Sequence, residues 1–559
     1  APDPAAGGGD AVGAPASPED SDSSGTNVQE TGIDEPDIVK SQGSIVYALA
    51  AGGLQAIGTG GDGGPHLRDT LELSTWNNQL LVAGDRVLVI GYVDTPIGPQ
   101  PIEDDPNAGV AYPDVYEPST ILTEVDVSDP SHLRVVRTET VDGLFVAARL
   151  NGTTARIVIS SVPRAIAEPK LRGKATGWRP SARLRKAGAK RGKRVLLGGC
   201  RSIRRPRAFS GLNSVTVLTI DMEKGLPGVD SDSVLSDAQL VYGSNRNLYV
   251  ATQRWLPAPE SADELLPSVV TALHKFDASK PGETSYDASG SVQGSLLSQW
   301  SMSDHDGSFR VASTDEPLWW DGAVRKQSES RVTVLREVDG RLVEVGRVDG
   351  LGVDQRIYAV RFIGDVGYVV TFRQIDPLYT LDLSAPANPR VAGELEVPGY
   401  SAYLHPVGED LLLGVGQDAG DDGRTTGAQL SLFDVSDPSD PRRLAKRHLG
   451  EGASSAVEYD HHGFLWWTPA KLAVLPLTLY DGSEKGEPFT GAVGFNVGRA
   501  IGIDEAGRTG HRWRDQTGYV SRSLVVRGRL FTLSDLGLAM NALDDLGPLG
   551  WAPFPAPGS

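Results

Sequence analysis

Titratable side chains recur at one position relative to a series of turn glycines. These glycines separate pairs of strand-like runs and are Gly43, Gly84, Gly152, Gly243, Gly307, Gly364, Gly408, Gly463 and Gly528. Six of the nine residues three positions earlier are charged or titratable, namely Lys40, Arg149, Asp304, Arg361, His405 and Asp460. If each glycine closes a hairpin, these residues occupy equivalent places on successive strands. We therefore expect them to form one layer around a common axis.

Two chemistries suit this layer. One is a belt of ion pairs, with Asp304 facing Arg361 and His405 facing Asp460. The other is a ligand or metal site, because carboxylate and imidazole groups bind Zn²⁺, Mn²⁺ or Ca²⁺. The candidate residues for this site are Asp304, His305, Asp306, Arg361, His405, Asp460 and His461. The layer lacks the i, i+4 histidine spacing of a zinc protease helix.

Two other groups of charged residues are candidates for binding. Asp34, Glu35 and Asp37 could hold Ca²⁺, although a turn and pairing with Lys40 also explain them. The segment from Arg164 to Arg207 contains 16 Lys and Arg residues and one acid. Its candidate anion-binding residues are Arg172, Lys174, Arg183, Arg185, Lys186, Lys190, Arg191, Lys193 and Arg194. The segment is a solvated loop, a site for an acidic protein or polyanionic envelope polymer, or a loop docked on its own acidic chain.

The composition excludes several classes of protein. A net charge of -19 argues against nucleic-acid binding, because phosphates require clustered Lys and Arg. The single cysteine, Cys200, rules out an intrachain disulfide and is expected to be a buried, inert thiol unless it forms an intermolecular bridge or is reactive. No run of about 18 apolar residues could span a membrane. We expect a processed, exported chain, with residues 1–26 as a flexible tether that could follow a lost or removed anchor.

Catalytic signatures are missing from the sequence. The chain contains no Gly-x-Ser-x-Gly elbow, no His-Glu-x-x-His helix and no Gly-x-x-x-x-Gly-Lys-Ser/Thr phosphate loop. Some repeat folds host enzymes whose catalytic residues are spread over several repeats. The missing motifs therefore make an enzyme the less favoured interpretation without excluding it.

The elements that must position these residues are short strands in groups of four. Runs 357–362, 368–372, 378–383 and 391–397 form one group, and runs 400–404, 411–415, 430–435 and 444–448 repeat it. Asp-x-Ser-x-Pro turns, in which Asp and Ser bond their own backbone and Pro fixes φ, follow the third run of both groups. The pattern predicts an all-β propeller of eight or nine four-stranded blades.

We place the propeller at residues 27–545, with a basic insertion at 162–210 and a Pro-rich tail at 546–559. The last hairpin lacks a clear fourth strand, so we expect residues 27–32 to supply it and close the ring.

Several motifs carry a resemblance to a known family. These are residues 26–40 (TNVQETGIDEPDIVK), 301–307 (SMSDHDG), 359–362 (AVRF), 376–378 (DPL) and 400–406 (YSAYLHP). The chain resembles secreted bacterial and archaeal β-propeller proteins that are distantly related to WD40 repeats. The resemblance implies the fold and export but no activity. We therefore expect an exported, non-catalytic binding or assembly platform of the bacterial cell envelope. The alternative is a metal-assisted hydrolase or lyase with a site near the propeller axis.

Overall fold

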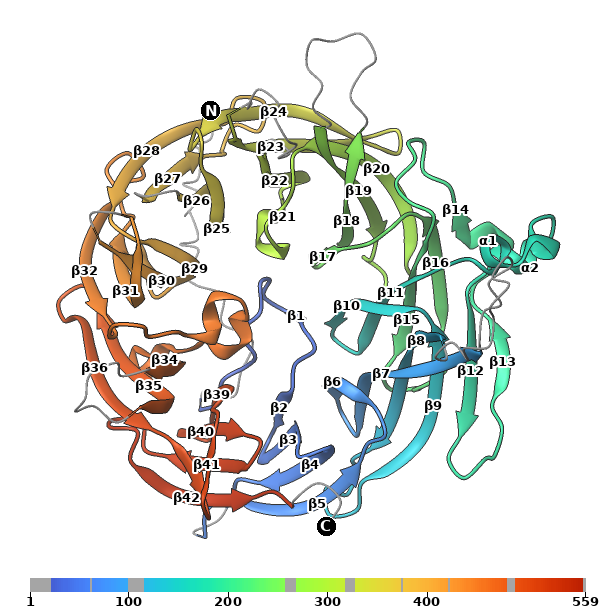
Figure 1. Ribbon diagram of the computed structural model, residues 1–559, viewed down its shortest axis with the longest axis horizontal. Helices are drawn as coiled ribbons and strands as arrows, with labels where there is room; N and C mark the ends of the chain where they lie inside the picture. Colours follow the sequence, from blue (N-terminus) through green and yellow to red (C-terminus); the bar gives the residue numbers. More distant parts are fainter. Residues whose placement is uncertain are drawn as a thin grey trace, which may run out of the picture.

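Short apolar strands form antiparallel sheets that follow one another around a closed ring (Figure 1). The computed structural model describes residues 22–60, 63–98, 115–256, 268–316, 327–372, 376–420, 423–479 and 488–555. Within these residues, nine sets of four antiparallel strands occur in chain order, joined mostly by short turns. The predicted all-β propeller is confirmed.

The first four sets occupy residues 39–293. They are β2 (Val39–Gln42), β3 (Ile45–Ala50), β4 (Gly53–Gly58) and β5 (His66–Glu72); β6 (Trp76–Ala83), β7 (Arg86–Gly98), β8 (Val115–Asp126) and β9 (Arg134–Asp142); β10 (Leu144–Asn151), β11 (Thr154–Ser161), β15 (Ser214–Asp221) and β16 (Asp230–Leu235); and β17 (Leu240–Gly243), β18 (Asn247–Leu256), β19 (Ser268–Asp277) and β20 (Ser285–Gln293).

The remaining five sets occupy residues 302–553. They are β21 (Met302–His305), β22 (Ser308–Asp315), β23 (Glu329–Val338) and β24 (Arg341–Leu351); β25 (Arg356–Ile363), β26 (Val366–Phe372), β27 (Asp376–Asp382) and β28 (Arg390–Val397); β29 (Tyr400–Pro406), β30 (Leu411–Ala419), β31 (Thr425–Asp434) and β32 (Arg442–His448); β33 (Leu465–Trp467), β34 (Leu472–Leu479), β35 (Phe489–Gly498) and β36 (Gly502–Thr509); and β39 (Arg522–Val526), β40 (Arg529–Ser534), β41 (Gly537–Asn541) and β42 (Pro548–Pro553).

A few elements lie outside these sets. The hairpin β37 (His511–Trp513) and β38 (Gln516–Gly518) precedes the last set, and β1 (Ile33–Asp34) pairs with β10. The helices α1 (Arg164–Ala167) and α2 (Ala175–Trp178), with β12 (Ser181–Lys186), β13 (Lys193–Leu196) and β14 (Ile203–Arg204), belong to residues 164–207, which we call the basic flap. Short 3₁₀ turns cover Pro169–Leu171, Cys200–Ser202, Gln299–Ser301, Ala456–Glu458, His461–Gly463 and Thr468–Ala470.

Local chemistry explains the turns between outer strands. After β8, the Asp126 carboxylate accepts hydrogen bonds from the Ser128 backbone N–H at 3.0 Å and the Ser128 hydroxyl at 2.7 Å. Asp382 with Ser384 and Asp434 with Ser436 repeat the arrangement after β27 and β31. The predicted turn role of these Asp-x-Ser sequences is confirmed.

The apolar core lies between neighbouring sheets. One cluster joins the third and fourth sets, where Val217 and Val158 pack with Val250 and Phe276. Another joins the first and last sets, where Val46 and Ile57 pack with Phe531. Each sheet is thus buried on both faces by its neighbours, as expected of a propeller.

The closure of the ring differs from the one predicted. The fourth strand of the last set is β42, which pairs with β41, so residues 548–553 belong to the propeller and not to a tail. Leu546 and Ala552 are buried there. Residues 27–32 do not supply this strand. Residues 1–21 of the predicted tether and residues 556–559 of the predicted tail lie outside the described residues.

The N-terminal residues instead run through the middle of the ring, where Figure 1 shows β1. We call residues 22–37 the axial segment. Near its start, the Ser24 backbone N–H donates to the Val525 carbonyl of β39 at 2.7 Å. Near its end, Asp37 and Leu80 of β6 exchange backbone hydrogen bonds at 3.3 and 2.8 Å. Between these points the segment touches the inner ends of the eighth, seventh, fifth, fourth and third sets.

Candidate functional site

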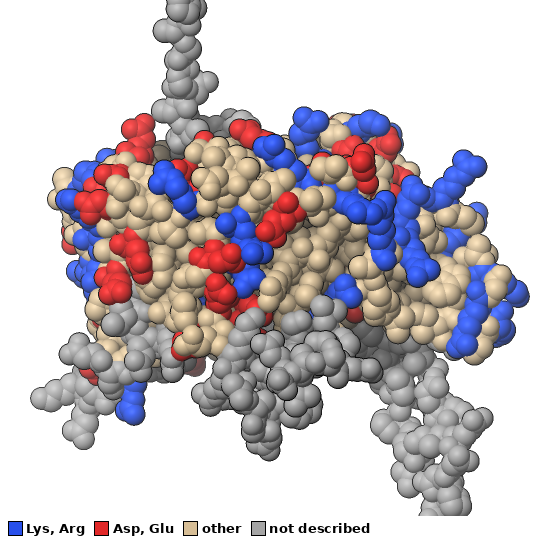
Figure 2. Space-filling view, turned by 90° about the horizontal axis from the view of Figure 1, so that it is seen from above, with Lys and Arg blue, Asp and Glu red and all other residues tan. Residues whose placement is uncertain are grey.

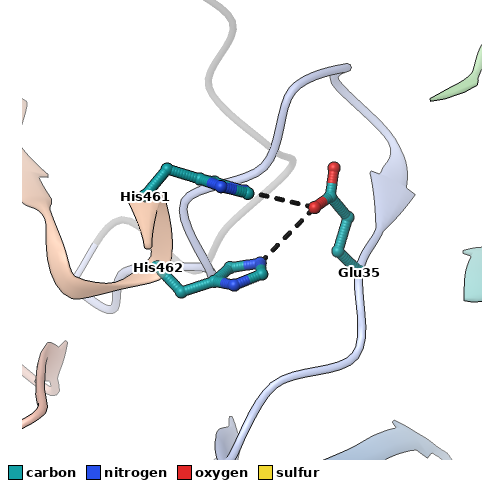
Figure 3. Close-up of side chains that lie close together, drawn as sticks. All are labelled: Glu35, His461 and His462. Carbon is teal, nitrogen blue, oxygen red and sulfur yellow. Dashed lines mark hydrogen bonds and ion pairs between the residues drawn. The ribbon is translucent and has the colours of Figure 1, made fainter. Parts of the chain in front are cut away.

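Three potential metal ligands meet beside the ring axis. Glu35 follows β1 in the axial segment, and His461 and His462 lie on the 3₁₀ turn His461–Gly463, more than 400 residues later. The Asp460 carboxylate caps this turn by accepting a hydrogen bond from the His462 backbone N–H at 3.1 Å, which turns both imidazoles toward Glu35. Figure 3 shows the two rings facing the same carboxylate. We call Glu35, His461 and His462 the axial cluster.

The distances in the axial cluster are short. Glu35 Oε2 lies 3.2 Å from His461 Nε2 and 3.4 Å from His462 Nε2. One ligand atom from each residue can be chosen so that all three lie within 4.8 Å of one another. Glu35 is only 3% exposed. The cluster has the composition of a site with two histidines and one carboxylate, which suits divalent transition metals.

Other charged groups surround the cluster. Arg522 donates to Asp37 at 2.8 Å and to Asp460 at 2.7 Å, so one guanidinium links the axial segment with the turn that carries the histidines. On the other side, Gln299 Nε2 donates to both oxygens of Glu35 at 2.8 and 3.0 Å. The nearest Arg149 nitrogen lies 3.9 Å from Glu35 Oε1.

These neighbours shift the protonation of the cluster. Burial alone would raise the pKa of Glu35, but the Arg149 guanidinium and the two imidazoles hold that pKa well below its usual range. Burial, reinforced by His462, lowers the pKa of His461. Burial would also lower the pKa of His462, but the carboxylates of Asp37, Asp460 and Glu35 raise it to about 9.

The structure brings together only part of the predicted inner layer. Asp304 accepts hydrogen bonds from Ser244 at 2.8 Å and Asn247 at 2.6 Å, within the fourth and fifth sets. His305 Nε2 lies 3.2 Å from the Asp365 carboxylate and 3.8 Å from Asp306. These residues therefore belong to a surface group apart from the axial cluster.

The two predicted ion pairs are wrong. The Arg361 guanidinium lies over the Trp300 ring at 4.5 Å, while Asp304 is held by Ser244 and Asn247. His405 Nδ1 lies 2.9 Å from the Tyr403 hydroxyl, and Asp460 is bound by Arg522. The alignment of turn glycines placed these residues on the correct inner strands or turns, but it could not give the direction of their side chains.

The predicted calcium site also differs from the structure. Asp34 pairs with Lys40 at 2.6 Å, as the turn interpretation expects. Glu35 faces the histidines and Asp37 faces Arg522, so the three carboxylates point to three different partners. The sequence treated Glu35 and His461 as members of separate sites and missed His462. The doubled histidine of Asp460-His-His-Gly was the available signal.

The basic flap is ordered by strand pairing. β12 adds to the outer edge of β9, and β13 pairs with β12, so the second set extends beyond the rim of the ring. The nine candidate bases named from the sequence are all exposed. Among the described residues, none of these nine bases forms an ion pair within 4 Å, so backbone pairing with β9 rather than charge pairing holds the flap on the ring. Figure 2 shows blue side chains gathered at the end of the molecule where Figure 1 places β12 and β13.

Two further expectations concern Cys200 and the membrane. Cys200 is an exposed free thiol, which contradicts its predicted burial. Across the described parts of the chain, no helix has both the length and the apolar character needed to cross a bilayer.

Comparison with known proteins supports the fold. Residues 23–546 match the family model described as "Beta propeller domain". An uncharacterised protein of Archaeoglobus fulgidus is 42% identical over 218 residues, 38% of this chain and 32% of that protein. An uncharacterised protein of Methanocaldococcus jannaschii is 42% identical over 188 residues, 34% of this chain and 28% of that protein. The matches thus span about a third of these curated relatives.

Among solved structures, the crystal structure of Saccharomyces cerevisiae Sqt1 aligns with 86% of this chain and 94% of its own, at 8% identity and a TM-score of 0.32, a likeness too weak to bear on function. The family model, in contrast, spans nearly the whole described chain. The chain therefore belongs to the beta propeller domain family.

Proposed function

We propose that this protein is an exported, non-catalytic binding platform of the cell envelope, and that its basic flap binds a polyanionic envelope polymer. The proposed export rests on the sequence resemblance. The proposed binding role rests on one structural observation, which is the row of exposed bases on β12 and β13 that form no ion pair with any described residue.

The register of the flap explains why these bases favour an anionic ligand. Arg183 on β12 lies directly opposite Arg194 on β13, and Lys186 lies opposite Arg137 on β9. Like charges that face each other across strands destabilise a sheet. A bound polyanion removes this repulsion, so binding and order of the flap support each other.

A polymer fits this surface better than a folded acidic protein. The bases project from exposed strand and turn positions along the flap, so repeated anionic groups can neutralise them one after another without a complementary apolar surface. The rest of the chain carries excess negative charge, which repels the polymer elsewhere and directs it to the flap.

Charge reversal in the flap tests this function. The variant carries Arg183→Glu, Lys193→Glu and Arg194→Glu, and the probe is a soluble poly(glycerol phosphate). We expect the affinity to fall about tenfold or more, together with a weaker dependence on salt, because phosphate contacts are lost. Isothermal titration calorimetry at two salt concentrations measures both quantities.

A matched control keeps the number of changes similar. Arg390→Glu and Arg442→Glu reverse bases that are 65% and 70% exposed on outer strands of other sets. This control should bind as the unchanged protein does. Equal affinity of flap variant and unchanged protein would rule out the flap as the site. Preference for polyglutamate over the phosphate polymer would instead favour an acidic protein partner.

A further inference from the structure

The axial cluster joins two distant parts of the chain through potential metal ligands. Glu35 belongs to the axial segment, whereas His461 and His462 belong to the eighth set of the ring. The distances from Glu35 Oε2 to the two Nε2 atoms are 3.2 and 3.4 Å. In a tetrahedral site with bonds of about 2.1 Å, neighbouring ligand atoms lie about 3.4 Å apart. The cluster therefore has the spacing of ligands around one ion.

His462 provides a second and independent observation. Its Nε2 atom is buried and lies 3.4 Å from Glu35 Oε2, a contact that does not have hydrogen-bond geometry. Its other ring nitrogen, Nδ1, lies 3.4 Å from Asp460 Oδ1. A carboxylate behind a histidine commonly orients the ring for metal binding through the opposite nitrogen. The His462 ring is thus held so that Nε2 faces the Glu35 carboxylate, as two ligands of one ion would face each other.

A cavity of about 790 Å³ lies beside the axial segment and borders His462, although Glu35 and His461 do not line it. Its lining includes His462, Asp34, Asp37 and Arg522. The cavity has room for water molecules that would complete the coordination of an ion bound beside His462.

We propose that Glu35, His461 and His462 bind one divalent transition-metal ion of the zinc class, which clamps the axial segment to the ring. Two imidazole nitrogens and one carboxylate oxygen suit Zn²⁺, Co²⁺ or Fe²⁺, whereas Ca²⁺ prefers oxygen ligands only. Gln299 then acts behind the metal, because its amide holds the Glu35 carboxylate in place. The clamp is independent of polymer binding at the flap.

Metal titration of the whole chain tests the site. The protein is stripped with chelator, and Co²⁺ alone is added while absorption in the visible range is recorded. We expect one equivalent to bind, with a spectrum of nitrogen and oxygen ligands and without thiolate bands, and Zn²⁺ to displace it. Zn²⁺ should also raise Tm. Failure of the unchanged protein to bind either ion saturably would overturn the proposal, whatever the variants do.

Two variants locate the ion. Glu35→Gln and His462→Gln each remove one ligand with little change in volume and should lower affinity about 100-fold or more. The control, His305→Gln, removes another histidine that lies among carboxylates but outside the cluster, and it should bind as before. Retained tight binding in the double variant Glu35→Gln/His462→Gln would contradict the assignment.

If these variants do not fold, crystals of the unchanged protein grown with Zn²⁺ decide the matter. An anomalous difference peak between the three side chains supports the proposal, and a peak only elsewhere refutes it.

Discussion

Glu139 is a carboxylic acid buried at the root of the basic flap. It lies on β9, opposite Leu122 on one side and Leu184 of β12 on the other, and it is 0% exposed. Neither carboxylate oxygen has a partner in hydrogen-bond geometry. Burial therefore raises the pKa of Glu139 to about 7, and the nearby Gly228 N–H offsets this only in part.

This buried acid should make stability depend on pH. Because the folded pKa lies above the ordinary value of 4.5, the stabilising effect is full below about pH 4.5 and is lost as the pH rises through about 7. A shift of this size corresponds to about 3 kcal/mol. The variant Glu139→Gln keeps a neutral side chain, so its stability relative to the unchanged protein should rise by about that amount between pH 4.5 and pH 8.

Urea unfolding at both pH values measures the unfolding free energy of the variant and of the unchanged protein. The difference between the two proteins removes the contributions of the other titrating groups, because both proteins share them. The exposed Glu409→Gln serves as the control and should show no such change. A constant difference between Glu139→Gln and the unchanged protein would mean that Glu139 stays charged throughout.

At the level of single residues, the sequence could identify which residues lie on inner strands but not which side chains they contact. Charged side chains at a repeated place before turn glycines correctly predicted inner positions such as Arg361 and His405. Their partners are Trp300, on the 3₁₀ turn Gln299–Ser301, and Tyr403, on the same strand as His405, and the spacing of turn glycines specified neither contact. Glu35 meets His461 only because the axial segment enters the ring, a long-range arrangement without a local pattern. The hydrolase alternative stays a hypothesis that depends on metal binding there.

The axial segment, which the sequence did not predict to enter the ring, contacts the inner elements of several sets. Its side chains form hydrogen bonds with groups on the inner elements of several sets. Asn27 Nδ2 donates to the Tyr403 hydroxyl at 2.9 Å, and Gln29 Nε2 donates to the Met302 carbonyl at 2.9 Å. The Tyr242 hydroxyl donates to Glu30 Oε1 at 2.6 Å. The segment therefore fills the space around the axis and ties several sets together.

Two truncations separate the roles of the N-terminal residues. Residues 1–21 belong to the predicted flexible tether, which is rich in Ala, Pro, Gly, Ser and Asp, so their removal should leave Tm unchanged. Removal of residues 1–32 breaks several hydrogen bonds of Ser24, Asn27, Gln29 and Glu30, so at about 1 kcal/mol for each bond it should cost at least about 4 kcal/mol. Thermal unfolding compares the two. Equal melting temperatures would show that the axial segment adds nothing to stability.

Element boundaries followed the sequence where the signals were local. Strand pairs around turn glycines and Asp-x-Ser turns recur along the sequence, so the successive four-stranded sets could be predicted. The flap could not, because its 16 bases suggest a solvated loop or an electrostatic dock. Its order comes from β12 pairing with β9, whose edge was free to accept another strand. Gly and Pro in residues 546–555 likewise concealed β42.

The whole ring closes where the first and last sets meet. These sets are far apart in the sequence, so their contact closes a loop of nearly the entire chain. Val46 and Ile57 of the first set pack against Phe531 of the last, and Asp37 and Arg522 form a buried ion pair at 2.8 Å across the same seam. No strand is shared between the two sets, so side-chain packing carries the closure.

The substitution Phe531→Ala should therefore open the ring at this seam. Phe531 is fully buried, and loss of its ring should cost about 3 to 5 kcal/mol. The control is Phe276→Ala, which makes a similar cavity between the third and fourth sets, where the chain itself joins the two sheets. Both variants should lower stability to a similar degree.

Only Phe531→Ala should produce local opening, because no short connecting segment of the chain joins the first set to the last, so these two sets can separate while the other sets stay packed. Hydrogen exchange followed by mass spectrometry should show faster exchange in β2–β5 and β39–β42, while β25–β32 stay protected. In Phe276→Ala, exchange in β2–β5 and β39–β42 should be no faster than the global stability of that variant predicts. If Phe531→Ala instead exchanges uniformly around the ring, the seam unfolds only with the whole molecule, and the axial segment rather than core packing holds the ends together.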